Sequence, residues 1–382
     1  MSGVIANGTF DISGTSAGAS ITSLSGAGSG AVALGARTLT LSNANGTFAG
    51  IIGGTGGLTL NAGNEILTGT NTYTGVTTVT AGTLQLGDGT TNGSIAGNAV
   101  VNGTLAFNPA SGTTLGYAGA ISGSGALTQI GTGTTNLTGA SSAFAGTTTV
   151  SNGTLLVNGA LGGAVTVTGG TLGGAGTIGG NVAIGAANLN PGNSPGTLTI
   201  NGNLALATGS VLNYEFGQAN AVGGTFDDLT VVGGNLILDG TLNVAVAPGG
   251  SFGPGVYRII SYGGSLTNNG LDLGSMPAGS ANLVQTSVAG QVNLVSTAGL
   301  PVNVWDGATG GKNDGTVTGG NGSWQASAGN DNWTTVDGTL NAPYANGSFA
   351  IFSATPGAVT VDNSLGQVIS GGMQFASGGY VI

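Results

Sequence analysis

Short stretches of alternating apolar and polar residues recur along this chain. They include TLTL from Thr38, TTVTAGTLQL from Thr77, AVTVTGGTL from Ala164 and GTLTING from Gly196. Alternation with many β-branched residues predicts strands with one face buried. Asn-Gly and Gly-Gly pairs separate the stretches, and both residue types accept the backbone conformations of tight turns. No segment has helical periodicity, so the pattern predicts an all-β protein.

The strand pattern is also repeated at long range. FAGIIGGTGGLTL from Phe48 returns as YAGAISGSGALTQ from Tyr117, 69 residues later. GTNTYTGVTTVTAGTLQL from Gly69 then returns from Gly139 as GASSAFAGTTTVSNGTLLV, with inserted residues. Repetition of a Gly-, Thr- and Leu-rich unit indicates stacked β-structure, in which each repeat buries its apolar side chains against its neighbours.

The spacing of one tripeptide predicts the length of each turn. Gly-Thr-Leu or a close variant begins at eight glycines, and several intervals fall between 16 and 21 residues: Gly82, Gly103, Gly153, Gly170, Gly176, Gly196, Gly224 and Gly240. Such an interval suits three short strands joined by tight corners. We therefore predict a right-handed parallel β-helix.

Two changes in composition divide the chain. The segment NPGNSPGTLTI from Asn190 opens a region of longer strands, and Leu300-Pro301 precedes a segment that contains Trp305, Trp324 and Trp333. We expect a repeat β-helix over 1–189, its continuation with longer strands and loops over 190–299, and a second, smaller β module over 300–382. The sequence stops within that module, so we expect the natural protein to be longer.

Composition excludes several classes of partner. The chain has 81 glycines in 382 residues, but 40% of its residues are hydrophobic and only 4% are charged, so it can bury enough apolar surface to fold. The net charge is −10, with Arg37, Arg258 and Lys312 as the only bases. Nucleic acid and anionic lipid surfaces are excluded, because binding to either depends on clustered Lys and Arg.

Export signals are absent from the sequence itself. The N-terminal MSGVIANGTFDIS has no basic region and no apolar core of a signal peptide, so we expect any export signal to lie outside these residues. There is no Cys. This suits a protein that crosses an oxidising compartment unfolded, although many other proteins also lack Cys.

The block LTGTNTYTGVTTVTAGTLQLGDG from Leu67 to Gly89 resembles the passenger-associated transport repeat, an autotransporter-associated β-strand repeat of passenger domains in type V secretion. Its parts fall on Gly57–Thr59, Leu67–Gly75, Thr77–Val79 and Gly82–Leu84. The second copy departs from the pattern at the corner, where Asn71 and Tyr73 are replaced by Ser141 and by either Ala143 or Phe144.

The resemblance implies a surface-exposed passenger of a Gram-negative autotransporter. It implies export through an outer-membrane β-barrel domain, expected outside this sequence, and a role in adhesion or autoaggregation. Host-cell or matrix surfaces, or other copies of the chain, are the implied partners. A structural spacer or secretion-assisting segment of a larger adhesin is an alternative, and a glycan-binding or carbohydrate-active β-helix is another.

Candidate chemistry is sparse. The chain has no His, so acid–base work at neutral pH would fall to carboxylates or Tyr. The chain has one pair of adjacent acidic residues, Asp227-Asp228. Two close carboxylates could serve glycoside hydrolysis or Ca²⁺ binding. We favour the interpretation that both residues lie in a turn or at the start of a strand. We expect no enzyme activity, catalytic residue, metal site or cofactor.

The remaining acids and aromatic residues are expected to be structural. Glu65, Asp88, Glu215 and Asp239 are expected at solvated corners, and Asp306, Asp314, Asp331 and Asp337 in turns rather than in a cation loop. The three tryptophans could form a sugar-stacking platform, but we favour core aromatics. Thr-x-Thr pairs such as Thr38/Thr40 could form an ice-binding face, but their spacing is too irregular to predict a stacked rank of Thr. Asn residues at corners could form stacked ladders, but left-handed turn geometry is the favoured explanation.

Overall fold

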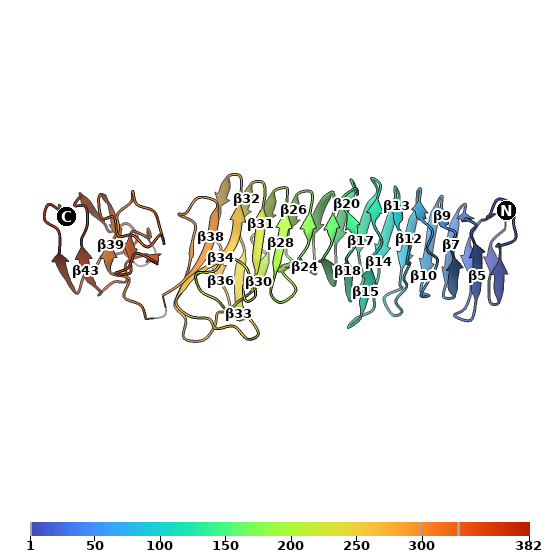
Figure 1. Cartoon of the computed structure of the whole chain (residues 1–382), viewed down its shortest axis with the longest axis horizontal. Coiled ribbons are helices and arrows are strands. Elements are labelled where there is room, and N and C mark those ends of the chain that lie inside the picture. Colours follow the sequence, from blue (N-terminus) through green and yellow to red (C-terminus); the bar gives the residue numbers. More distant parts are fainter. Residues whose placement is uncertain (1, 298, 327–328) are drawn as a thin grey trace.

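A computed structural model describes residues 2–297, 299–326 and 329–382. Across these residues there is no helix, and short strands stack in parallel register to form an elongated β-helix. The two termini lie at opposite ends of the molecule (Figure 1). The predicted all-β solenoid is therefore confirmed.

One face of the rod is a continuous 11-stranded parallel sheet. At its N-terminal end it follows a two-stranded sheet of β1 (Val4–Ile5) and β4 (Leu24–Ser25). The strands of the first face are β7 (Ala44–Phe48), β10 (Gly63–Leu67), β12 (Thr83–Leu86), β14 (Thr104–Phe107), β17 (Ala126–Gln129), β20 (Thr147–Val150), β23 (Ala164–Val167), β26 (Val182–Ile184), β29 (Leu204–Leu206), β32 (Leu236–Leu238) and β35 (Leu266–Asn268).

The second face consists of a three-stranded sheet followed by an eight-stranded sheet. Its strands are β2 (Thr9–Asp11), β5 (Ala31–Gly35) and β8 (Ile51–Gly54), then β15 (Thr114–Tyr117), β18 (Thr134–Leu137), β21 (Thr154–Val157), β24 (Thr171–Gly174), β27 (Asn188–Pro191), β30 (Val211–Phe216), β33 (Thr241–Val246) and β36 (Asp272–Leu273).

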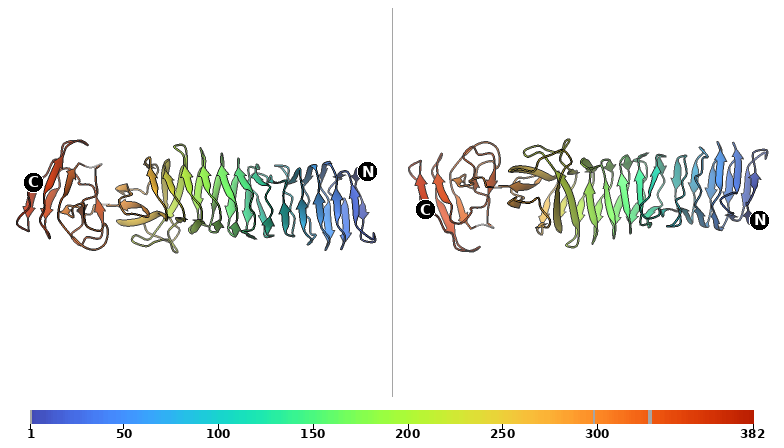
Figure 2. Two further views of the ribbon diagram at one scale, coloured as in Figure 1. Left: turned by 90° about the horizontal axis from the view of Figure 1, so that it is seen from above. Right: turned by 90° about the horizontal axis from the view of Figure 1, so that it is seen from below.

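The third face consists of a six-stranded sheet and an eight-stranded sheet. Its strands are β3 (Ala19–Ile21), β6 (Leu39–Leu41), β9 (Leu58–Leu60), β11 (Thr77–Val79), β13 (Ala99–Val101) and β16 (Ile121–Ser122), then β19 (Ala140–Ser141), β22 (Ala160–Leu161), β25 (Thr177–Ile178), β28 (Thr197–Ile200), β31 (Leu229–Val232), β34 (Gly255–Tyr262), β38 (Gln291–Ser296) and β37 (Asn282–Gln285). Figure 2 shows the stacked coils from two further sides.

The alternation in the sequence places one apolar side chain of each strand above that of the preceding coil. Leu84, Leu105 and Leu127 are aligned in the parallel register of β12, β14 and β17, and all three are buried. Each coil thereby covers the apolar side chains of its neighbours, which is the main stabilisation available to a solenoid. The resulting core cluster extends from Ala6 to Leu294. The expected boundaries at residues 190 and 300 stay predictions.

The two copies of the long repeat lie on different faces. Leu58 is aligned through Thr77 and Ala99 with Ile121, three coils further along the rod. The counterpart of Leu58 in the second copy is Leu127, which lies one strand later, on the first face. A copy can move to the next face because every face imposes the same alternation of buried and exposed positions.

The corner of the second copy keeps its contacts despite its altered residues. In the first copy, Asn71 Oδ1 accepts a hydrogen bond of 2.9 Å from Ile52 N. In the second, Ser141 Oγ accepts one of 2.9 Å from Ile121 N. Phe144 is buried as Tyr73 is, so Phe144 rather than Ala143 is the counterpart of Tyr73.

The C-terminal segment forms a second β module with its own core. One sheet contains β42 (Asn341–Ala342), β41 (Trp333–Thr334), β39 (Val304–Trp305), β43 (Phe349–Phe352) and β45 (Gly372–Phe375); the other contains β40 (Gly322–Gln325) and β44 (Val359–Asp362). Trp305, Trp324 and Trp333 are buried, with ring centroids 5.3 Å apart for Trp305–Trp333 and 5.0 Å for Trp324–Trp333. This confirms that the tryptophans are core aromatics.

Polar contacts join this module to the end of the rod. Gln285 Nε2 of β37 donates to Asp331 Oδ2 at 2.8 Å, and Asn313 Nδ2 donates to Gln285 Oε1 at 2.6 Å. Gln285 is buried, so these bonds satisfy amide groups that would otherwise be costly to bury.

Candidate functional site: an asparagine-lined groove

The loop before β28 and the loop before β31 enclose the acid pair, whose side chains are both buried. Asp227 and Asp228 immediately precede β31, as expected of strand-start residues. Asp228 accepts from Gly196 N at 2.8 Å through Oδ1 and from Glu215 N at 2.7 Å through Oδ2. Asp227 Oδ1 accepts from Gly217 N at 2.8 Å. Both side chains therefore tie a loop to the rod.

Burial alters the proton affinity of both carboxyl groups. The pKa of Asp228 is raised to about 7, chiefly by burial; the backbone donors Glu215 N and Gly196 N act to lower it, and the charges of Glu215 and Asp227 act to raise it. Burial also raises the pKa of Asp227. The pair thus differs from the solvated Asp88, whose pKa is lowered by hydrogen bonds from Thr90 and Thr91.

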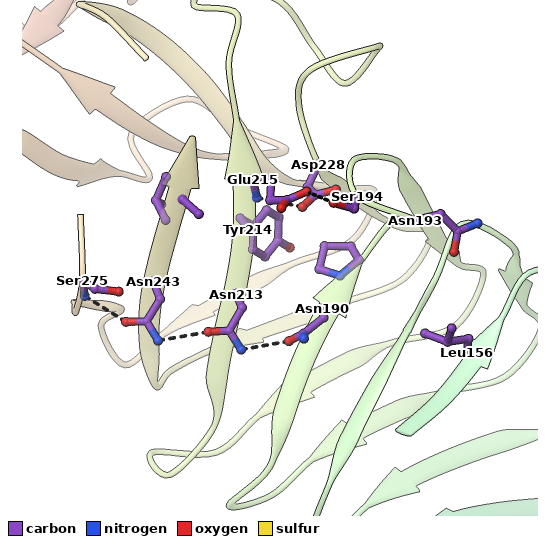
Figure 3. A pocket seen from close by; sticks show the side chains of 14 residues that line it. Leu156, Asn190, Asn193, Ser194, Asn213, Tyr214, Glu215, Asp228, Asn243 and Ser275 are labelled. Carbon is purple, nitrogen blue, oxygen red and sulfur yellow. Dashed lines mark hydrogen bonds between the residues drawn. The ribbon is translucent and has the colours of Figure 1, made fainter. Parts of the chain in front are cut away.

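A groove of about 600 Å³ lies beside Asp228. Its residues come from β21, β27, β30 and β33 of the second face, from the loop after β27, and from positions just before β31 and just after β36. They are Leu156, Asn190, Pro191, Gly192, Asn193, Ser194, Asn213, Tyr214, Glu215, Asp228, Asn243, Val244, Ala245 and Ser275. We call this feature the asparagine groove. Figure 3 shows its side chains.

One side of the asparagine groove is a ladder of amides. Asn243 Nδ2 donates to Asn213 Oδ1 at 3.0 Å, and Asn213 Nδ2 donates to Asn190 Oδ1 at 2.8 Å (Figure 3). Ser275 N completes the ladder by donating to Asn243 Oδ1 at 2.9 Å. On the other side, Ser194 Oγ donates to Glu215 Oε2 at 2.6 Å.

This lining is suited to hydrogen bonding. The groove contains amides, the hydroxyls of Ser194, Tyr214 and Ser275, and two carboxyl groups, and no Lys or Arg lines it. Among the described residues, no group of three or more His, Cys, Asp or Glu side chains is arranged to hold a metal ion. A neutral polar ligand therefore fits the lining better than an anion.

The asparagines contradict the expectation of left-handed geometry. In the described residues, Asn220 and Asn313 are the asparagines with positive φ. Several of the others instead form ladders, such as the one formed by Asn190, Asn213 and Asn243. A second ladder lies on the first face, where Asn181 Oδ1 accepts from Asn203 N, and Asn203 Oδ1 accepts from Asn235 N. Equivalent corners stack in a solenoid, so each amide can satisfy a backbone group of the next coil.

A rank of threonines also stacks, formed by residues outside the Thr-x-Thr pairs considered above. Thr114, Thr134, Thr154 and Thr171 are in register on four successive strands of the second face. Their side chains point outward and are partly or fully exposed. The intervals in sequence are irregular because corner lengths vary, whereas the strand register is constant.

The Asp-rich set of the C-terminal module does not converge as a whole. Asp337 binds Thr335 and Thr339 locally. Asp306, Asp314 and Asp331 lie near Lys312, and their charges raise the pKa of its ammonium group, although burial has the larger effect and lowers it. A half-buried cation thus lies near these carboxylates.

Glu65 is the largest departure from expectation. It was expected at a solvated corner, but it lies in the middle of β10 with its side chain in the core. Both carboxylate oxygens are buried without a hydrogen-bond partner among the described residues, and burial raises the pKa of Glu65 to about 8. Glu215 is also mid-strand, in β30, but faces outward, so the corner expectation is wrong for it too. Asp88 is an exposed turn residue, as expected.

A signal for Glu65 was present in the sequence. In GNEIL, Glu65 is two residues before Leu67, so the two side chains must share a face of the strand. Gly46, which is aligned with Glu65 on β7, has no side chain, and the Leu24 backbone packs closely against it, since a Cβ at Gly46 would lie 2.1 Å from Leu24 O.

These features define a parallel β-solenoid with a shallow polar groove and apolar ladders inside. The chain is 50% identical over 360 residues to the "Adhesin BmaC autotransporter" of Brucella suis biovar 1 (strain 1330). The match covers 91% of this chain and 10% of that protein, so the chain spans about a tenth of the relative's length. The resemblance to autotransporter passengers is confirmed by this homology and by the solenoid fold. No protein-family model matches the chain. None of the described residues belongs to a helix that could cross a membrane.

Proposed function

We propose that this chain is a surface-exposed, non-enzymatic segment of an autotransporter passenger that acts in adhesion and autoaggregation. The observation that carries the proposal is the 50% identity, sustained over 91% of the chain, to a protein named an autotransporter adhesin. The same relationship supports export through the outer membrane of a Gram-negative bacterium.

The surface of the rod supports a distributed mode of binding. Its outward positions carry ranks such as Thr114, Thr134, Thr154 and Thr171 instead of charges. With 4% charged residues, two rods repel each other weakly at long range. Contact along the length of the rod, to a host or matrix surface or to another copy, can then supply affinity without a deep pocket.

The absence of catalysis is proposed on chemical grounds. The chain has no His, and the carboxylates of Asp227 and Asp228 are engaged by backbone N–H groups of neighbouring strands and loops. Carboxylates used in this way position loops; Asp228 would have to give up both of its backbone bonds to act on a substrate, and the second oxygen of Asp227 is buried away from solvent.

The test is to display the chain on a non-adherent Gram-negative strain, fused to an autotransporter barrel. A control strain displays an unrelated passenger of similar length at the same surface density, verified with an epitope tag. We expect faster settling or greater attachment to host cells and matrix, reversed by purified chain. Equal display without either behaviour would refute the proposal and favour a spacer or secretion-assisting segment.

A further inference from the structure

The asparagine groove has the chemistry of a carbohydrate site. We propose that it binds a linear neutral glycan, laid along the rod axis across the strands of the second face. This inference rests on the proposed adhesive function and names a partner class for it.

The first argument is the direction of the groove. The groove crosses one sheet from β21 to β33, and one residue from each of four strands lines it: Leu156 of β21, Asn190 of β27, Asn213 of β30 and Asn243 of β33. The remaining strand of this stretch, β24, lies between β21 and β27. Gly173 of β24 is buried between Leu156 and Asn190 and adds no side chain there. The result is an elongated depression that crosses several coils rather than a pit within one coil. From β21 to β33 there are four strand spacings, which at ~4.8 Å each extend over roughly 19 Å, and one spacing is close to the length of one sugar ring.

The second argument is the hydrogen-bonding capacity that remains in the ladder. Asn213 uses one N–H toward Asn190 and one oxygen lone pair toward Asn243. An amide has two N–H donors and two lone pairs, so one of each is left. A donor and an acceptor side by side match the vicinal hydroxyl groups of a sugar, and the ladder repeats this pair at each coil.

The third argument is selectivity by charge. Glu215 and Asp228 line the groove, whereas Arg37, Arg258 and Lys312, the only bases of the chain, do not. An anionic or sulfated glycan would therefore meet carboxyl groups without a compensating cation. Neutral hexoses and N-acetylhexosamines avoid this repulsion, and their C–H faces can contact Leu156 and Ala245, which are not fully buried.

The groove presents no exposed aromatic ring, because Tyr214 is buried. A single groove should consequently bind weakly. Many rods on one cell would raise the effective affinity through multivalency. Weak sites repeated on a surface are compatible with an adhesin.

The experiment uses the whole 382-residue chain and four- to six-unit oligosaccharides. Cello-, malto- and chito-oligosaccharides serve as neutral probes, and oligogalacturonates serve as acidic probes. Binding is followed by saturation-transfer NMR and calorimetry. We expect at least one neutral probe to bind and the acidic probe not to bind. Failure of all neutral probes, or preferential binding of the acidic probe, would overturn the proposal.

Two substitutions locate the binding. Asn213→Ala removes the centre of the ladder and should weaken binding at least tenfold. Ala245→Leu, at an exposed position, should obstruct the groove without touching the core. Asn203→Ala is the matched control, because it removes the centre of the other ladder, on the first face. Circular dichroism verifies that each variant folds. An equal loss of glycan binding in Asn203→Ala would overturn the assignment of the glycan to the asparagine groove. Unchanged glycan binding by both Asn213→Ala and Ala245→Leu would also overturn it.

The two proposals fail separately. If displayed wild-type chain adheres and Asn213→Ala and Ala245→Leu adhere equally well, adhesion stands and the groove has no part in it, which overturns the present inference. If purified chain binds neutral glycan through the groove but displayed cells do not attach, the inference stands and the proposed adhesion fails.

Discussion

The ionisable side chain of Glu65 predicts an unusual dependence of stability on pH. Glu65 lies between Gly46 of β7 and Leu84 of β12 in the register of the first face, with its carboxyl group inside the core. Its pKa is about 8 in the folded chain against an ordinary value of 4.5. The unfolded chain therefore releases this proton at lower pH than the folded chain does.

Thermodynamic linkage sets the sign and size of the effect that Glu65 has on the free energy of unfolding. The contribution of Glu65 to stability is fully present below pH 4.5 and declines as the pH rises, until it levels off above pH 8. Each pH unit within this window costs roughly 1.4 kcal/mol, so from pH 4.5 to 7 the free energy of unfolding should fall by about 3 kcal/mol through this group. Glu65→Gln cannot titrate and should lack this decline.

The assay is denaturant unfolding of wild type and Glu65→Gln at several pH values between 4.5 and 8. Far-UV circular dichroism is the appropriate probe, because the tryptophans all lie in the C-terminal module and would not report on β10. Asp88→Asn is the control: that carboxyl group is exposed and its pKa lies below the ordinary value of 3.8, so its effect on stability falls at lower pH than the assay covers, and Asp88→Asn should keep the wild-type pH dependence. If the free energy of unfolding changes with pH in the same way for wild type and Glu65→Gln, the inference that Glu65 is buried and protonated is refuted.

Three further predictions concern packing, ionisation and chain cleavage. Gly97→Ala should destabilise the chain by more than about 2 kcal/mol in denaturant unfolding, because a Cβ there would lie 2.2 Å from Gly75 O. Gly116→Ala is the control: a Cβ at Gly116 would have no atom within 4 Å, so this variant should unfold almost as the wild type does. The Asp228 carboxyl carbon should titrate near pH 7 by carbon-13 NMR, and a midpoint near 4 would contradict its burial. Trypsin should leave the interval from Arg37 to Arg258 intact even after unfolding, since it contains no other Lys or Arg, and a nonspecific protease should spare it only in the folded chain.

The local pattern was sufficient for the class of fold and for most buried positions. The alternation around Thr83–Leu86 depends only on which side chains share a strand face. The recurrence of Gly-Thr-Leu depends only on where the chain turns. The same reasoning correctly assigned the tryptophans to a core, because a segment with little other large apolar material must bury them. It failed for Glu65, where the type of residue was given more weight than its phase relative to Leu67.

The candidate site could not be predicted in the same way. Asn190, Asn213 and Asn243 are 23 and 30 residues apart, so no regular spacing in the sequence relates them. They meet because the 190–196 loop and the longer loops after β30 lengthen the coils without changing the strand register. Sequence reasoning singled out Asp227-Asp228 in this region, but not the amides that line the groove beside Asp228.

The sequence by itself determined that this chain is a stack of short strands with small, uncharged outward side chains, because strand alternation and turn chemistry are local properties. Only the tertiary structure decided which face each repeat occupies and which distant residues become neighbours. Leu58 and Leu127 belong to equivalent positions of two copies, but they lie on different faces. The physical reason is that stacking fixes the register of hydrogen-bonded strands, whereas the corners between them can take in residues at little cost.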